Sequence, residues 1–139
     1  MILLDTNVLS ELMRPQPRAG IAKWLDERLE SDVWICTITH AEILYGIAVM
    51  PDGRRRADLA ARAEELFSWF ALTTASFDAL AAREFALLGA ARRRRGRPID
   101  HPDAQLAAIA LSLGCTLATL NARDFEGIDR LKVVDPSRE

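Results

Sequence analysis

The chain has 139 residues, of which 50% are hydrophobic and 27% charged, and its formal net charge is −2. This length and composition predict one globular domain, spanning residues 1–139, with a core large enough to be stable without disulfides. A net charge this small excludes a global basic field, so a site for nucleic acid has to arise from local clusters of cations. Neither a membrane span nor a signal peptide is predicted, which makes the cytoplasm the expected compartment.

Short apolar segments alternate with helical stretches along the chain, and this order predicts an α/β fold. Strands are predicted at residues 2–4, 33–37, 116–120 and 131–134, with a weaker one at 71–73. Apolar residues at helical spacing predict three amphipathic helices, marked by Ile21, Trp24, Leu25 and Leu29, by Leu59, Ala63, Leu66, Phe67 and Phe70, and by Phe77, Leu80, Ala81, Phe85 and Leu88. Strands separated by helices indicate a parallel sheet covered on both faces.

Asp5 directly follows the first apolar run and precedes Thr6 and Asn7. Ligands of open α/β sheets bind at the carboxyl ends of the strands, so an acid at this point is a candidate site residue. The other interpretation is a strand-to-helix turn in which one of these three residues caps the next helix. Both interpretations stay open on position alone.

Glu42 follows the second predicted strand. The spacing Thr39-x-x-Glu42 before an apolar run is that of a capping box, which favours a capping role. The position of Glu42 nevertheless matches that of Asp5, because both stand where a helix leaves the carboxyl end of a strand. Glu42 is therefore a second candidate for the site.

Asp103 stands at the start of a small, apolar helix. Pro102 is typical of a first helical turn, Asp100 of an N-cap, and Asp103 of the position where an acid interacts favourably with the helix dipole. Because such a helix is expected to pack into the protein, its first turn would hold the Asp103 carboxylate rigidly.

The predicted strand at 116–120 also ends in polar groups. Thr119 and Asn121 are two residues apart, which places both on one side of an extended chain. Asn121 offers a carbonyl oxygen and Asp124 a carboxylate. The alternative is a turn that begins at Asn121, after which Phe125 packs into the core.

Parallel strands bring their carboxyl ends to one edge of a sheet. Asp5, Glu42 and Asn121 are therefore expected to converge there, joined by Asp103 from the neighbouring helix. Carboxylates that are pressed together repel, and a hard divalent cation relieves that repulsion. Oxygen ligands without Cys or paired His select Mg²⁺, with Mn²⁺ as a substitute, over Zn²⁺. The expected chemistry is metal-assisted attack of water on a phosphodiester.

Four stretches of the chain stand in an order that is more specific than any of them alone. They are Leu3–Leu12, Thr39–Ile47, Ile99–Ala110 and Leu117–Phe125, and together they span nearly the whole chain. The ordered set resembles the VapC-type toxins of the PIN-domain ribonuclease family, nearest the FitB-like branch. This resemblance implies a three-layer α/β/α fold with a central parallel sheet of four or five strands.

The resemblance also implies a function and its partners. The chain would be the toxin of a type II toxin–antitoxin system and a Mg²⁺-dependent endoribonuclease. It would form a homodimer, or a higher assembly, with a cognate VapB-type antitoxin whose C-terminal segment blocks the active site.

The resemblance assigns roles to individual residues of this sequence. Asp5, Glu42 and Asp103 match the metal-binding acids of the family. The fourth family position falls within residues 119–124, where Asn121 or Asp124 fills it. The supporting positions are those of Thr6, Asn7 and Thr119.

The basic run Arg92-Arg93-Arg94-Arg95-Gly96-Arg97 leads into the loop before Asp103. The sequence predicts that it binds the phosphates of RNA beside the acidic site, through Arg93, Arg94, Arg95 and Arg97. The alternative is a solvated helix end, where cations interact favourably with the helix dipole. A second basic cluster, at residues 54–56, is interpreted as charge on a helix surface.

Apolar and aromatic residues outside the predicted site are assigned to packing and to a partner surface. Trp24, Trp34 and Trp69 are interpreted as core or dimer contacts rather than as platforms for bases. An exposed apolar groove for the antitoxin is predicted around Leu9, Leu12, Met13, Tyr45 and Ile47.

Two other functions are compatible with the acids. One is another Mg²⁺-dependent phosphoryl hydrolase, such as a haloacid-dehalogenase-like phosphatase, although Asn7 stands where that chemistry needs a second acid. The other is a catalytically silent PIN module that binds RNA or protein, against which the three intact acids argue.

Overall fold

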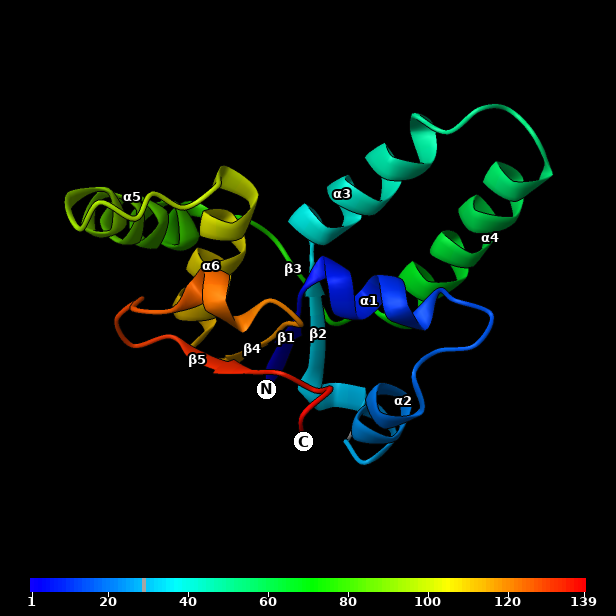
Figure 1. Cartoon of the computed structure of the whole chain (residues 1–139), viewed down its shortest axis with the longest axis horizontal. Coiled ribbons are helices and arrows are strands. Elements are labelled where there is room, and N and C mark those ends of the chain that lie inside the picture. Colours follow the sequence, from blue (N-terminus) through cyan, green and yellow to red (C-terminus); the bar gives the residue numbers. More distant parts are fainter. Residues whose placement is uncertain (29) are drawn as a thin grey trace.

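The computed structural model describes residues 1–28 and 30–139 (Figure 1). Five strands form one sheet: β1 (Ile2–Leu4), β2 (Val33–Cys36), β3 (Thr74–Ala75), β4 (Thr116–Ala118) and β5 (Lys132–Val134). The helices are α1 (Thr6–Leu12), α2 (Ala19–Asp26), α3 (Thr37–Ala48), α4 (Arg54–Trp69), α5 (Ala79–Arg94) and α6 (His101–Leu113). Two short 3-10 helices, η1 (Glu30–Asp32) and η2 (Ala122–Phe125), complete the elements.

All four strand pairs are parallel, and the strand order is β3-β2-β1-β4-β5. The chain therefore builds the sheet outward from β1 to β3, and then returns to the other side of β1 to add β4 and β5. Its direction reverses between β1 and β4, where Leu3 pairs with Leu117. In open α/β sheets the crevice at such a reversal is where ligands bind. The predicted parallel sheet is confirmed, and it has five of the expected four or five strands.

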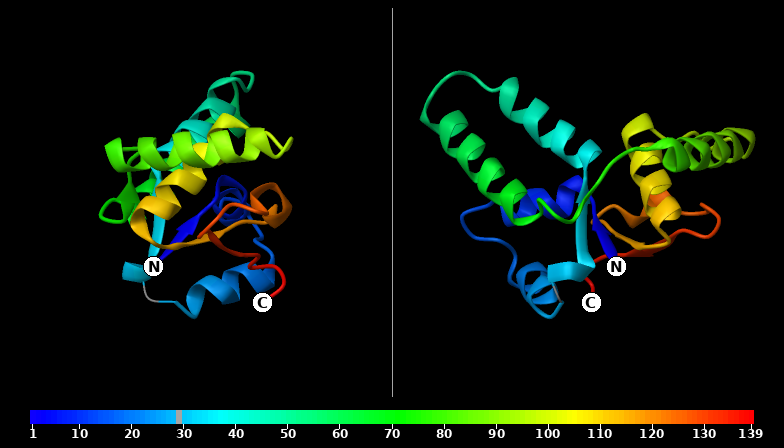
Figure 2. Two further views of the ribbon diagram at one scale, coloured as in Figure 1. Left: turned by 90° about the vertical axis from the view of Figure 1, so that its left-hand side faces the viewer. Right: turned by 180° about the vertical axis from the view of Figure 1, so that it is seen from behind.

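Side chains along each strand alternate between two cores, because successive residues of a strand point to opposite faces. Leu3 and Leu117 pack with α5 and α6, whereas Leu4 and Ala118 pack with residues of α1, α2 and α4. The sheet thus lies between two helical layers, as the resemblance implied. Figures 1 and 2 show α3 and α4 as a hairpin that leaves the sheet on one side, with α5 extending on the other. None of the helices in the described residues is long and apolar enough to cross a membrane.

The predicted strand at 71–73 is wrong by a few residues. The backbone N–H of Thr73 donates to the carbonyl of Phe70 at 2.9 Å, so these residues form a turn after α4, and β3 begins only at Thr74. Leu80 was assigned to the buried stripe of its helix but is exposed, because α5 turns Ala81 and Leu88 inward instead. The predicted position of Leu29 lies outside the described residues.

The predicted antitoxin groove is only partly exposed. Leu9 and Met13 are buried in the core beneath α1, so they are wrong as surface residues. Leu12 and Ile47 are partly buried, while 72% of Tyr45 is exposed. Helical spacing alone does not distinguish an apolar residue that is buried in the core from one that is exposed for a partner. Only the packing of the helix shows which of the two it is.

Among the tryptophans, Trp24 is buried and the prediction of a core contact is confirmed there. Trp34 is partly buried in β2 and packs against the α5–α6 core. Trp69 is 70% exposed at the end of α4, so the core interpretation fails for it. Trp69 is the last residue of α4 and lies off the buried stripe, which Leu66, Phe67 and Phe70 form.

Candidate active site at the carboxyl edge of the sheet

Asp5 lies at the point where the strand order reverses, and it is both a strand end and a helix cap. Its backbone N–H donates to the carbonyl of Ala118 at 2.9 Å, which continues the pairing of β1 with β4. Its Oδ1 accepts the backbone N–H of Thr6 at 2.6 Å and so caps α1. Only 6% of Asp5 is exposed. The capping interpretation is therefore confirmed, and the position of Asp5 at the carboxyl end of β1 keeps it a candidate site residue.

The second oxygen of Asp5 is held by side chains from two segments. Asp5 Oδ2 accepts the hydroxyl of Thr119 at 2.6 Å and Asn7 Nδ2 at 3.1 Å. Asn7 Oδ1 in turn accepts the backbone N–H of Leu120 at 3.1 Å. Thr119 is fully buried. These bonds orient the Asp5 carboxylate, as outer groups do for a metal-binding acid.

Glu42 approaches Asp5 from α3. The hydroxyl of Thr6 donates to Glu42 Oε1 at 2.8 Å, which ties α3 to the first residue of α1. The predicted capping box is wrong, because α3 already begins at Thr37 and its N-cap is Cys36. Thr39 lies inside the helix, fully buried, with its hydroxyl 3.5 Å from Cys36 Sγ. Glu42 is therefore free of a capping role.

Asp103 occupies the first turn of α6, where it was predicted. Pro102 also lies in this turn, and Asp100 is the N-cap residue through its carbonyl, which accepts the N–H of Ala104 at 2.9 Å. The Asp100 side chain makes no capping hydrogen bond. Asp103 is half-buried. The rigid start of a packed helix thus carries the third acid.

The charges of the acids act on one another. Burial raises the pKa of Asp103 to about 6, and the charges of four other acids add to the effect: Asp5, Asp124, Asp100 and Glu42. Burial also raises the pKa of Asp5, with a smaller contribution from the charge of Glu42, although the hydrogen bonds from Thr119, Thr6 and Asn7 oppose it. The three predicted metal ligands therefore share one electrostatic environment.

Asn121 and Thr119 do not lie on one side of the chain. Strand β4 ends at Ala118, so the alternation that was assumed stops before both residues, and Thr119 is buried while Asn121 is exposed. The Asn121 carbonyl accepts the N–H of Asp124 at 3.0 Å, and Phe125 is buried. The alternative of a turn at Asn121 is confirmed. Asp124 is the residue of this turn whose charge reaches Asp103.

The donor set fits a hard divalent cation that keeps part of its water. Within residues 1–28 and 30–139, no three His, Cys, Asp or Glu side chains approach closely enough to enclose an ion. Mg²⁺ is usually held by one or two carboxylates and several waters rather than by a closed protein cage. Asp5, Glu42 and Asp103 supply oxygen atoms only, and the charges of Asp5 and Glu42 disfavour ionisation of Asp103. A cation placed among them would relieve that repulsion.

Residues 2–131 of the chain match the PIN domain family. The chain belongs to this family. It is 35% identical to the VapC ribonuclease Y4jK of Sinorhizobium fredii over 99% of this chain and 100% of that protein. It is also 35% identical to the toxin FitB of Neisseria gonorrhoeae over 93% of this chain and 94% of that protein. The fold matches the crystal structure of FitAcB from Neisseria gonorrhoeae with a TM-score of 0.91, at 34% identity over 100% of both chains. The predicted resemblance is confirmed.

The basic run of this PIN domain divides into a buried and an exposed part. Arg92 is only 6% exposed, and its Nε donates to the carbonyl of Arg97 at 2.8 Å. Its Nη1 donates to the carbonyls of Asp124 and Glu126 at 3.1 and 3.0 Å. Arg92 thereby ties the end of α5 to the loop that carries Asp124. From the sequence alone, Arg92 could not be distinguished from the other arginines of the basic run.

The other arginines of the run lie on the surface. Arg95 donates to the carbonyl of Gly127 at 2.6 Å, and Arg97 lies 4.0 Å from Glu126. Arg93 and Arg94 are exposed in the last turn of α5. The interpretation as a helix end is therefore correct in part, and exposed cations remain beside the loop that precedes Asp103.

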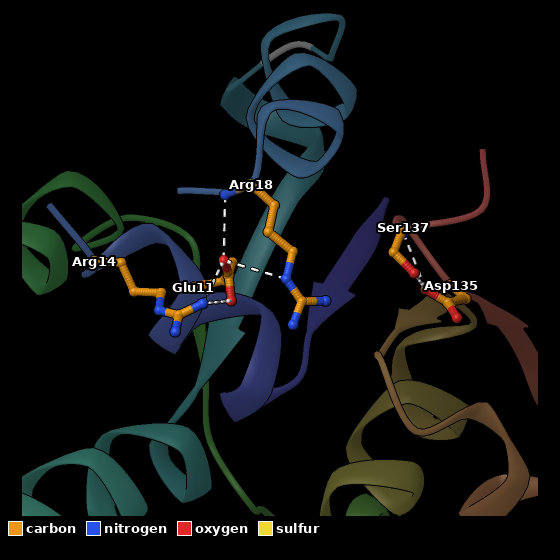
Figure 3. Close-up of polar contacts among 5 residues, drawn as sticks. All are labelled: Glu11, Arg14, Arg18, Asp135 and Ser137. Carbon is orange, nitrogen blue, oxygen red and sulfur yellow. Dashed lines mark hydrogen bonds and ion pairs between the residues drawn. The ribbon is translucent and has the colours of Figure 1, made fainter. Parts of the chain in front are cut away.

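Glu11 was not singled out by the sequence, yet it anchors the far end of α1 (Figure 3). It is buried, and its Oε1 accepts Arg14 Nη1 at 3.1 Å and the backbone N–H of Arg18 at 3.2 Å. Burial alone would raise the pKa of Glu11, but these bonds and the charges of Arg14 and Arg18 together lower it. The i, i+3 spacing of Glu11 and Arg14, at the point where α1 ends, is the signal that could have revealed this pair.

A stability measurement tests the crowding of the acids. We expect Asp103→Asn to raise the melting temperature of the metal-free protein by a few degrees at pH 7.5. The pKa of Asp103 is raised from 3.8 to about 6, so the stability that this group contributes is fully present below pH 3.8 and is lost as the pH rises through 6. Replacement by a neutral amide removes that loss. The favourable effect of an acid on the helix dipole, about 0.3–1 kcal/mol, limits the gain.

Thermal unfolding in the presence of a chelator, followed by circular dichroism, measures this gain. It should vanish at pH 4, where Asp103 is protonated in the wild type. Asp52→Asn, in the exposed turn between α3 and α4, is the matched control: it removes only a surface ion pair with Arg56, worth about 0–1 kcal/mol, and should give no gain at either pH. A variant no more stable than wild type at pH 7.5 would show that the acids do not destabilise one another.

Proposed function

We propose that this PIN domain is the toxin of a type II toxin–antitoxin system and acts as a Mg²⁺-dependent endoribonuclease. The observation that carries this proposal is the gathering of acids at the point where the strand order reverses, where the charges of Asp5 and Glu42 both contribute to raising the pKa of Asp103. The relatives whose names include VapC ribonuclease and toxin FitB support the reaction and the biological role. Since the similarity covers nearly the whole of each chain, the proposal treats residues 1–139 as one PIN-like domain.

We assign the metal to Asp5, Glu42 and Asp103, with Mn²⁺ as a substitute for Mg²⁺. When bound, such a cation neutralises charge on the scissile phosphate and acidifies an attacking water. Asp124 adds negative charge at the fourth family position, and Asn121 offers an amide to water or substrate beside it. The exposed arginines Arg93, Arg94, Arg95 and Arg97 would bind phosphates next to this site.

The supporting residues determine how the acids are presented. Thr119 and Asn7 hold one oxygen of Asp5, and Thr6 holds one oxygen of Glu42. Because these bonds exist before a substrate arrives, substrate binding does not have to order the two carboxylates. The role of Thr6, Asn7 and Thr119 is therefore to position acids rather than to exchange protons.

The partners follow from the same proposal. A toxin of this kind would be blocked by a cognate VapB-type antitoxin, and would form a homodimer or a higher assembly with it. Exposed apolar residues near the site offer a surface for that partner, among them Leu44, Tyr45 and Val49 on one side of the α3–α4 hairpin. The compartment proposed for this protein is the cytoplasm, where RNA and such an antitoxin would meet it.

The metal requirement can be tested by its dependence on pH. Below about pH 6, protons compete with the cation for Asp103, since a protonated carboxyl group is a poor ligand. We expect the Mg²⁺ concentration that gives half-maximal cleavage of single-stranded RNA to rise about tenfold per pH unit below 6, as one-proton competition requires. Above pH 7 it should be constant. The assay uses purified chain without antitoxin, with sequencing of the new 5′ ends.

Chelation should abolish cleavage, and Mn²⁺ should restore it. Magnesium-induced thermal stabilisation, measured without RNA, should show the same pH dependence. Cleavage that persists in excess chelator would exclude the metal-dependent mechanism, and a half-saturating concentration that is constant from pH 5 to 7.5 would remove Asp103 from the ligand set.

A further inference from the structure

A basic groove of about 650 Å³ lies between the end of α1 and the first half of α4. The charged and polar residues that line it are Ser10, Arg14, Arg54, Arg55, Asp58 and Arg62. Among the described residues of the lining, four arginines thus outnumber one acid, Asp58, whose Oδ2 lies 3.9 Å from Arg54 Nε. In a chain whose net charge is −2, this is a strong local excess of positive charge. The sequence had indicated only surface charge at residues 54–56.

Two of these arginines are held in place by the protein. Arg62 Nη1 donates to the carbonyl of Met13 at 3.1 Å, and Arg14 Nη1 donates to the buried carboxylate of Glu11 (Figure 3). Each guanidinium carries five N–H donors, so both arginines keep donors for a ligand. The side chains are ordered before binding, which lowers the entropic cost of holding an anion. The groove is therefore a preformed site for anionic groups.

The groove begins next to the proposed active site. Ser10 is one helical turn after Thr6 on α1, a distance of about 6 Å along the helix axis. Thr6 is the residue that holds Glu42. An extended polyanion in the groove would thus continue directly to the acids. Figure 2 shows the α3–α4 hairpin and α5 on opposite sides of the sheet.

We propose that the basic groove binds the phosphates of single-stranded substrate RNA on one side of the cleaved bond. This inference rests on the proposed function, and it states where the RNA substrate of the proposed ribonuclease binds. An acidic site repels the phosphates that it has to cleave, and cations at its flanks offset that repulsion. Planar guanidinium groups match phosphate oxygens in pairs. The groove leads toward the acids, so RNA bound in it reaches the site, and the test below distinguishes RNA from an acidic polypeptide.

The test is the salt dependence of RNA binding by the full chain in the presence of a chelator, so that no cleavage occurs. The probe is a fluorescein-labelled oligouridine, and binding is followed by fluorescence anisotropy at a series of KCl concentrations. Each phosphate contact with single-stranded nucleic acid contributes about 0.7 to the slope of log K against log[KCl]. The double variant Arg54→Gln/Arg55→Gln should reduce the slope by about 1.4. Both side chains are exposed on α4, so the fold should be retained.

The matched control is Lys23→Gln/Lys132→Gln, which removes the same charge from α2 and from the start of β5. Its slope should equal that of the wild type. Equal slopes in all three proteins would overturn the proposal, as would equal reductions in both double variants. A variant that loses binding to polyglutamate but not to oligouridine would assign the groove to an acidic polypeptide instead.

The outcome separates this inference from the proposed function. If wild-type protein cleaves RNA but the arginine variant keeps the full salt slope, the groove is not the RNA path although the enzyme is a ribonuclease. If the slope falls as expected but no RNA is cleaved in Mg²⁺, the groove binds RNA and the catalytic proposal fails.

Discussion

Asp5→Asn is expected to lower the rate of RNA cleavage by about 100-fold or more, since loss of one preorganised charged group at a reacting phosphate typically costs that much. Asp5 is buried where the strand order reverses, and its two oxygens accept hydrogen bonds from Thr6, Asn7 and Thr119. An amide has almost the same shape but lacks the charge that a cation needs. Because one of the two accepting oxygens becomes an NH2 group, the variant loses part of these hydrogen bonds and should be less stable than the wild type. Single-turnover cleavage of single-stranded RNA in Mg²⁺, at a temperature at which circular dichroism shows the variant to be folded, measures its loss of activity.

Two further variants distinguish the loss of a metal ligand from the loss of a residue that positions this ligand. Thr119→Val removes the hydroxyl that donates to Asp5 Oδ2 and keeps the shape, so it should cost about 10- to 100-fold, as outer groups of metal sites do. Raising the Mg²⁺ concentration should restore part of the activity of Thr119→Val but none of that of Asp5→Asn. Asp52→Asn should cleave at the wild-type rate. If Asp5→Asn retained full activity while folded, the assignment of the site would be wrong.

Arg92→Ala is expected to destabilise the protein by about 3 kcal/mol. The Arg92 guanidinium is buried and donates to the carbonyls of Arg97, Asp124 and Glu126. Hydrogen bonds from a charged donor are worth about 1.5–3 kcal/mol each, and buried carbonyls left without a donor add a penalty. For a chain of this length the melting temperature should fall by about 10 °C, as measured by calorimetry.

Arg93→Ala is the natural control, because the neighbouring side chain is exposed and should change stability by less than about 0.5 kcal/mol. Arg93→Ala should instead weaken RNA binding, whereas Arg92→Ala should act chiefly on the fold. Equal melting temperatures for the two variants would contradict the division of the basic run into a buried and an exposed part.

The sequence by itself determined the layered α/β architecture and which acids follow the ends of its strands. Short apolar runs such as Ile2–Leu4 and Val33–Cys36 are covered on both faces, and strands of this kind occur in parallel sheets flanked by helices. Each run ends in polar residues, and parallel strands end at one edge. The convergence of Asp5 and Glu42 follows from this rule, without knowledge of which strands are neighbours.

Only the tertiary structure decided how these residues are held. The bond between Asp5 and Thr119 joins residues 114 positions apart, and it exists because β4 lies directly beside β1. The local pattern at Thr39 and Glu42 predicted a cap, but the helix begins two residues earlier and leaves Glu42 to the Thr6 hydroxyl. The burial of Arg92 likewise depends on a loop distant in sequence. The spacing of residues along the chain reflects the local conformational preference of one segment. Hydrogen bonds between segments depend instead on the order of the strands in the sheet, which the sequence of one segment does not reveal.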